Sequence, residues 1–116
     1  MLADIQQQER LQKICRMAES GSHRSIRDLA VEFHLSPSHL QHLFKQSTGA
    51  RLGRWLAERR LQHAARLLTE CNMSVKEVAY AVGYKHPSSF VRAFERLFGQ
   101  APGQFQHKML TKRRFG

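Results

Sequence analysis

Apolar residues recur three and four positions apart in several segments of the chain, the spacing that places side chains on one face of an α-helix. The first set predicts an amphipathic helix that ends near Gly21; its members are Leu11, Ile14, Cys15 and Ala18. Residues 1–8 before it are expected to be frayed or to be a cut end. No segment shows the strict alternation of apolar and polar residues that is typical of a strand. The pattern therefore predicts an all-α fold of about seven helices.

Capping residues mark the boundaries of the later helices. A serine is followed three positions later by an acidic residue at two places, which predicts capping boxes. The two pairs are Ser25 with Asp28 and Ser74 with Glu77. Ser36 is expected to cap a helix that begins at Pro37, because a proline at the first helical position loses no hydrogen bond. Gly49 is expected to end the third helix in the left-handed conformation, and Gly99 follows the sixth helix.

Two segments of the chain, 25–49 and 74–99, repeat one pattern of residues. The matched pairs include Ser25 and Ser74, Ala30 and Ala79, Pro37 and Pro87, Leu40 and Phe90, and Phe44 and Phe94. The offset is 49 residues before the central turn and 50 after it, so the second turn contains one inserted residue. Two units are too few for a solenoid. The repetition instead indicates one small recognition motif that occurs twice in the chain.

Each copy has the residues that a helix-turn-helix motif requires. The motif needs a small residue where its helices cross and, four positions later, a residue that tolerates positive φ. The second copy provides Ala79 and Gly83, and the first provides Ala30 and His34. Histidine tolerates the left-handed region less well than glycine does. The second motif is therefore the stronger match.

The repeats and the helix between them predict how the chain is organised. A helix from about Leu52 to Glu70 would be about 27 Å long at 1.5 Å per residue. We predict two helix-turn-helix subdomains, 1–50 and 72–108, joined by this connecting helix in segment 51–71. Pro102 is expected to begin a last short turn, and residues 109–116 are expected to form a basic tail.

The charge of the chain indicates a polyanionic partner. Nineteen Lys and Arg residues stand against nine Asp and Glu residues, which gives a net charge of +10 in 116 residues. A charge of this size favours nucleic acid through counterion release. The chain has no apolar run of 18 residues, and its first residues are too polar for a signal peptide. We therefore expect a cytoplasmic protein without a membrane partner.

The chain resembles the DNA-binding domain of the AraC/XylS family of bacterial transcription regulators. The resemblance extends from about Leu11 to Phe105 and is carried by LSPSHLQHLFKQSTG, by WLAERRLQHAARLLTE and most specifically by VKEVAYAVGYKHPSSFVRAFERLFGQAPGQF. It implies a sequence-specific regulator, an activator that works with RNA polymerase in the bacterial cytosol or nucleoid. It also implies that two recognition helices enter successive major grooves of double-stranded DNA, about 34 Å apart. A monomer could then cover both grooves.

The resemblance leaves two forms of the protein open. The chain could be a complete regulator without an effector domain, or the C-terminal domain of a longer regulator.

Helical periodicity and the resemblance select the same base-reading positions. In the third helix an inward face is expected to include Leu40, Leu43, Phe44 and Ser47, and in the sixth helix Phe90, Ala93, Phe94 and Leu97. The opposite faces carry Ser38, Gln41, His42 and Lys45 in the third helix and Ser88, Val91, Arg92 and Glu95 in the sixth. The base-reading positions that the resemblance implies are Ser38, Gln41, His42, Pro87, Ser88, Val91 and Arg92. Arg92 could bind guanine O6 and N7 together, and Gln41 could bind adenine N6 and N7. Val91 could contact a thymine methyl group.

Other polar residues near these helices are predicted to bind phosphates. They are Arg24, Lys45, Arg54, Lys85, Ser89 and Arg96. Three positions depart from the family pattern, and at one of them Ser38 replaces a larger group. His42 stands where some relatives carry Arg, and Glu95 stands where Lys is common, so Glu95 would repel phosphate unless it accepts from cytosine N4 or pairs with Arg92.

Enzymatic and metal-dependent functions find no support in the sequence. The chain has no nucleophile with a neighbouring base and no phosphate-binding loop, so we predict no catalytic residue and no cofactor. His39 and His42 lie three positions apart, but no carboxylate or cysteine completes a zinc site, so no metal is expected. Two alternatives to the regulator are a DNA-repair methyl acceptor, which would need a reactive cysteine, and a nonspecific architectural DNA binder.

Overall fold

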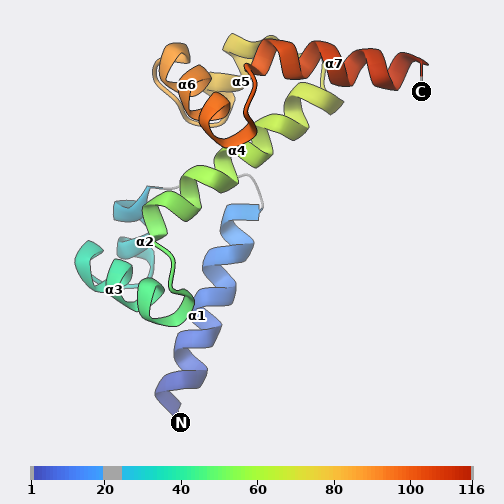
Figure 1. The fold of residues 1–116 in the computed structure, drawn as a ribbon. Helices are drawn as coiled ribbons and strands as arrows, with labels where there is room; N and C mark the ends of the chain where they lie inside the picture. Colours follow the sequence, from blue (N-terminus) through green and yellow to red (C-terminus); the bar gives the residue numbers. More distant parts are fainter. Residues whose placement is uncertain (1, 20–24, 116) are drawn as a thin grey trace. The chain divides into compact units, whose positions relative to one another are not determined.

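The structure is a computed structural model that describes residues 2–19 and 25–115, with the side chains of residues 8–16 and 25–113. Within these ranges it contains seven helices and no strand (Figure 1). The helices are α1 (Leu2–Glu19), α2 (Ile26–Glu32), α3 (Pro37–Thr48), α4 (Leu52–Glu70), α5 (Val75–Ala81), α6 (Pro87–Phe98) and α7 (Pro102–Phe115). The predicted all-α fold is confirmed, and α4 has the predicted bounds.

Side-chain caps fix the starts of α2, α3 and α5. The backbone N–H of Asp28 donates to Ser25 Oγ (3.1 Å), and that of Glu77 donates to Ser74 Oγ (3.1 Å). In both boxes the acidic side chain accepts from the serine backbone N–H in return. Ser36 Oγ accepts from the backbone N–H of His39 (3.1 Å) at the start of α3. These caps satisfy donors that the first turn of a helix cannot pair internally.

The turns of the two helix-turn-helix motifs have the same backbone geometry. His34 has a φ of +57° and Gly83 a φ of +95°, as the sequence predicted for these two positions. The following residue closes each turn: the N–H of Leu35 donates to Ala30 O (2.9 Å), and the N–H of Tyr84 donates to Ala79 O (3.0 Å). Ala30 and Ala79 are both buried, so the small side chain lets the two helices of each motif approach closely.

The chain forms two compact units, Met1–Arg59 and Arg60–Gly116. Helix α4 contributes its beginning to the first unit and its end to the second. The core of the first unit consists of Ile14, Leu29, Ala30, Phe33, Leu40, Phe44, Leu52 and Leu56. The core of the second consists of Leu61, Ala64, Leu68, Val78, Ala79, Val82, Phe90 and Phe94. The buried residues of the predicted connecting helix, segment 51–71, belong to both cores.

Both ends of the chain differ from the prediction. Residues 2–8 were expected to be frayed, but they belong to α1, consistent with the high helix propensity of Ala and Gln. Helix α7 continues to Phe115, where a short turn and a basic tail were expected. Side chains of α7 hold the end of α4 and the next turn: Gln106 Nε2 donates to Met73 O (2.6 Å), and Arg113 Nη1 donates to Thr69 O (2.5 Å). The last carbonyls of a helix have no partner within it, so these two donors tie α7 to the end of α4 and the turn after it.

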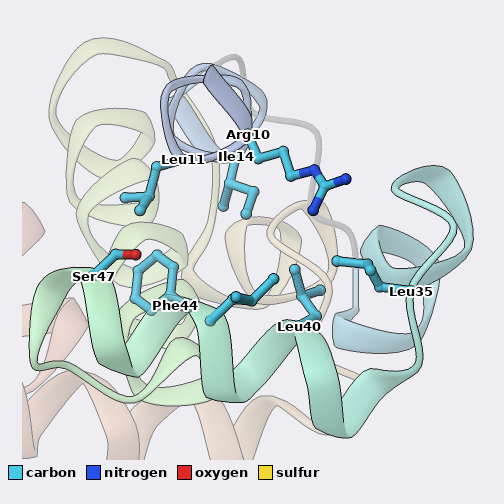
Figure 2. Close-up of a pocket in the computed structure, with 8 residues that line it drawn as sticks. Arg10, Leu11, Ile14, Leu35, Leu40, Phe44 and Ser47 are labelled. Atoms are coloured by element: carbon cyan, nitrogen blue, oxygen red, sulfur yellow. The ribbon is translucent and has the colours of Figure 1, made fainter. Parts of the chain in front are cut away.

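Helix α1 packs on α3 and leaves a narrow apolar cleft between them. Figure 2 shows Leu11 and Ile14 of α1 directed toward Leu40 and Phe44 of α3. The volume of the cleft is about 20 Å³, enough for about one water molecule. The contact therefore holds α3 in place and offers no room for an effector.

Candidate nucleic-acid interface

The second helix of the first motif, α3, has one buried face and one open face. Leu40 and Phe44 are buried in the core of the first unit. The predicted outer residues are all exposed: Ser38, Gln41, His42 and Lys45. Ser47 was expected on the inner face, but it is exposed at the edge of the cleft with α1. The outer face carries only polar and basic groups that packing does not use, so these groups are available to a ligand.

The second helix of the second motif, α6, is anchored by aromatic residues. Phe90 and Phe94 are fully buried, and Tyr84, in the turn before α6, packs edge-on against Phe90 at 5.5 Å between ring centroids. Burial raises the pKa of the Tyr84 phenol. The ring contact with Phe90 ties the turn to the start of α6. Three predicted outer residues are exposed: Ser88, Arg92 and Glu95.

Two residues of α6 do not lie where periodicity placed them. Val91 was expected to point outward, but it is half-buried against the core of the second unit. Leu97 was expected to point inward, but its side chain is 39% exposed. The reason is that Phe98 covers Phe94 in its place, with 4.4 Å between ring centroids, and Phe105 of α7 completes the cluster. Pro87, at the start of α6, is half-buried.

The structure exposes most of the predicted phosphate-binding residues. The exposed members are Lys45, Arg54, Lys85, Ser89 and Arg96. Arg24 lies outside the described residues. Arg54 Nε forms an ion pair with Glu58 Oε1 (3.5 Å), and the Arg54 side chain remains 83% exposed. Because a guanidinium has two further nitrogens that donate, this ion pair does not prevent a phosphate contact.

A broad depression lies between α3 and the beginning of α4, and one of the cations that line it, Arg51, was not among the residues predicted to bind DNA. Its volume is about 900 Å³, and its polar and aromatic lining consists of Gln41, Lys45, Arg51, Arg54, Trp55 and Glu58. Arg51 immediately precedes α4 and is exposed. Periodicity could not reveal Arg51, because it lies in the turn between two helices.

The described residues give little support to other kinds of site. Among them, no three His, Cys, Asp or Glu side chains lie close enough together to hold a metal ion. No helix in the described ranges is long and apolar enough to cross a membrane.

Comparison with known proteins identifies this arrangement. Residues 29–108 match a family described as a helix-turn-helix domain. The chain is 42% identical over 74 residues to the HTH-type transcriptional regulator GlxA of Rhizobium meliloti and 34% identical over 87 residues to the arabinose operon regulatory protein of Salmonella typhimurium. The chain belongs to the AraC/XylS family. The matches cover 64% and 75% of this AraC/XylS domain, but only 23% and 31% of the two relatives.

A solved structure agrees with the family assignment. The DNA-binding domain of AdpA, solved in complex with a target DNA, superposes with a TM-score of 0.79 at 26% identity and covers 92% of this chain and 97% of that one. The chain is therefore a DNA-binding domain of an AraC/XylS transcription regulator, as its sequence predicted. Its relatives and its fold are those of regulators and not of enzymes.

Proposed function

We propose that this domain binds promoter DNA sequence-specifically by inserting α3 and α6 into successive major grooves. The observation that carries the proposal is the pair of matched motifs, each with an anchored inner face and an exposed outer face on its second helix. Two such helices in one chain would let a monomer bind a site with two blocks. The net charge of +10 favours the duplex over other partners.

The residues proposed to read bases have different chemistries. Arg92 would recognise guanine and Gln41 would recognise adenine, because both side chains can form two hydrogen bonds to one base. The remaining members of the set are Ser38, His42, Pro87, Ser88 and Val91. Since Val91 is half-buried, only part of its side chain could contact a thymine methyl group. The proposed phosphate contacts are Arg24, Lys45, Arg54, Lys85, Ser89 and Arg96.

The proposal also covers what binding accomplishes. The family resemblance supports activation of transcription through RNA polymerase, in the bacterial cytosol where promoters lie. The domain would do this alone or as the C-terminal part of a longer regulator. A transcription assay with purified RNA polymerase, on a promoter that carries the preferred site, should yield more transcript when the domain is added. Unchanged or reduced transcript would contradict activation.

Selection of bound sequences from a pool of random duplexes tests DNA recognition. Two preferred blocks about one helical turn apart are expected, since each major groove would be read by one helix. A single block would contradict insertion of both helices. A pool without any enriched sequence, together with equal competition by random duplex, would support the architectural alternative and contradict sequence-specific binding.

A further inference from the structure

The internal repeat continues beyond the second helix of each motif. Helix α4 begins at Leu52 and α7 begins at Pro102, 50 residues later, and both residues are buried. Gly49 and Gly99, which end α3 and α6, have φ values of +76° and +75°. The matching backbone means that corresponding positions in the two units can be compared for charge, residue by residue.

The corresponding surfaces beside α3 and α6 differ in charge. The depression beside α3 is lined by Lys45, Arg51 and Arg54 and by one carboxylate, Glu58, a net charge of +2 from three cations and one anion. Fifty residues later the same positions hold Glu95, Ala101, Gln104 and Lys108, a net charge of zero. The basic character of this surface is therefore confined to the first unit.

Two positions on α3 and α6 carry a cation only in the second unit, whereas Lys45 and Glu95, which are also exposed on these helices, differ in the same sense as the depression. His42 of α3 corresponds to Arg92 of α6, and Gln46 corresponds to Arg96. Both arginines are exposed. Cations beside a recognition helix are placed for the sugar–phosphate backbone, as proposed for Arg96, whereas Arg92 on the outer face of α6 can reach base edges in the groove.

We infer that the two units divide the work of DNA binding. The first unit binds the phosphodiester backbone in the depression formed by Lys45, Arg51 and Arg54. The second unit has no cation at the three matching positions, so its proposed phosphate contacts lie elsewhere, at Lys85, Ser89 and Arg96, and it supplies most of the sequence discrimination through Arg92. The inference rests on the proposed function for its second part. The binding of DNA phosphates in the depression requires only duplex DNA of any sequence.

Removing two positive charges from the depression tests whether it binds phosphates. Affinity of the parent and of Arg51→Gln/Arg54→Gln is measured by fluorescence anisotropy at several salt concentrations, on the selected site and on a random duplex. Each lost phosphate contact lowers the slope of log affinity against log salt by about 0.9. The double variant should therefore lose about 2 from the slope and weaken on both duplexes by the same factor, with an unchanged specificity ratio.

A charge-matched variant separates a local contact from a general effect of net charge. Lys108→Gln/Lys112→Gln removes two exposed lysines of α7, one of them at the position that matches Glu58. This variant should change the slope by less than about 1. The inference is overturned if it lowers the slope as much as Arg51→Gln/Arg54→Gln does. It is also overturned if the depression variant keeps the parental slope or selectively loses affinity for the preferred site.

Two further measurements keep the outcomes distinct. Arg51→Lys/Arg54→Lys retains the charges, and its recovery of the parental slope would show that the loss did not come from misfolding. If the parent prefers no sequence, the proposed function fails, yet the salt slope on random duplex still decides whether the depression binds phosphates. If the parent is selective, Arg92→Ala should reduce the specificity ratio more than Gln41→Ala does, and the reverse order would overturn the division of work.

Discussion

The ring of Phe105 lies 5.4 Å from the ring of Phe94, the same centroid separation as that between Trp55 and Phe44, fifty residues earlier. Phe105 belongs to α7 and Trp55 to α4, so α7 is the structural counterpart of the beginning of α4. The repeated unit therefore includes three helices, α2 to α4 and α5 to α7. In both copies an aromatic residue from the third helix packs on the buried phenylalanine of the second helix and fixes its position.

Replacing Phe94 should test how strongly this aromatic cluster stabilises the second unit. Phe94 is fully buried and contacts the rings of Phe90, Phe98 and Phe105. Phe94→Ala should lower the free energy of unfolding by about 3–5 kcal/mol, because it removes buried apolar surface and leaves a cavity. Urea denaturation followed by far-UV circular dichroism measures the loss, and Phe94→Leu should lose less. A loss below about 1 kcal/mol would show that the cluster does not anchor α6.

Exchanging residues at the two motif turns should change stability in opposite directions. His34 adopts a positive φ of +57°, which strains a residue with a Cβ, whereas Gly83 adopts +95° without that strain. His34→Gly should stabilise the domain by about 0.5–1 kcal/mol after the greater flexibility of unfolded glycine is subtracted. Gly83→Ala should destabilise it by about 1–2 kcal/mol. Thermal denaturation of both variants would contradict this account if the two shifts had the same sign.

The capping box of α5 should make stability depend on pH. Hydrogen bonds from the backbone N–H and then from the hydroxyl of Ser74 lower the pKa of Glu77 below its ordinary value. A carboxyl group with a lowered pKa in the folded state stabilises the fold above its unfolded pKa of about 4.3. This contribution is lost as pH falls through the folded pKa.

Glu77→Gln removes the titrating group and gives the comparison. The urea midpoint of the parent should fall more steeply below about pH 5 than that of Glu77→Gln, because only the parent loses the carboxylate cap there. Ser74→Ala should also flatten the dependence, since it removes the hydroxyl. Parallel loss of stability in the parent and both variants would mean that this carboxyl group has no net effect.

Local chemistry explains why much of the fold could be predicted from the sequence. The capping pair Ser74 and Glu77 and the turn residues His34 and Gly83 act through neighbouring backbone atoms, so their effects are visible in a few consecutive letters. The course of α7 was missed because it depends on distant acceptors: Arg113 donates to the carbonyl of Thr69, 44 positions away. A run of basic residues gives no sign of such a partner.

Prediction of the candidate site had a similar limit. The periodicity of α3 correctly identified an outer face that includes Gln41 and His42, because α1 and α2 cover only the opposite side. In α6 the same rule misplaced Val91 and Leu97, since the neighbouring aromatic residues determine which side chain is covered. A helical wheel describes one helix by itself. It carries no information on the size of the residues that pack against that helix.

Arg92 provides the most direct test of base recognition. Arg92→Ala should weaken binding to the selected site by about 1–3 kcal/mol and relax the preference at one base pair, because the bidentate contact to guanine is lost. Arg92→Lys should keep part of the affinity through its charge and weaken the base preference, since a flexible ammonium group matches the two guanine acceptors less well than the planar guanidinium does. Affinities for the selected site and for its single-base variants measure both effects. If Arg92→Ala binds every duplex as tightly as the parent does, α6 does not read bases through this side chain.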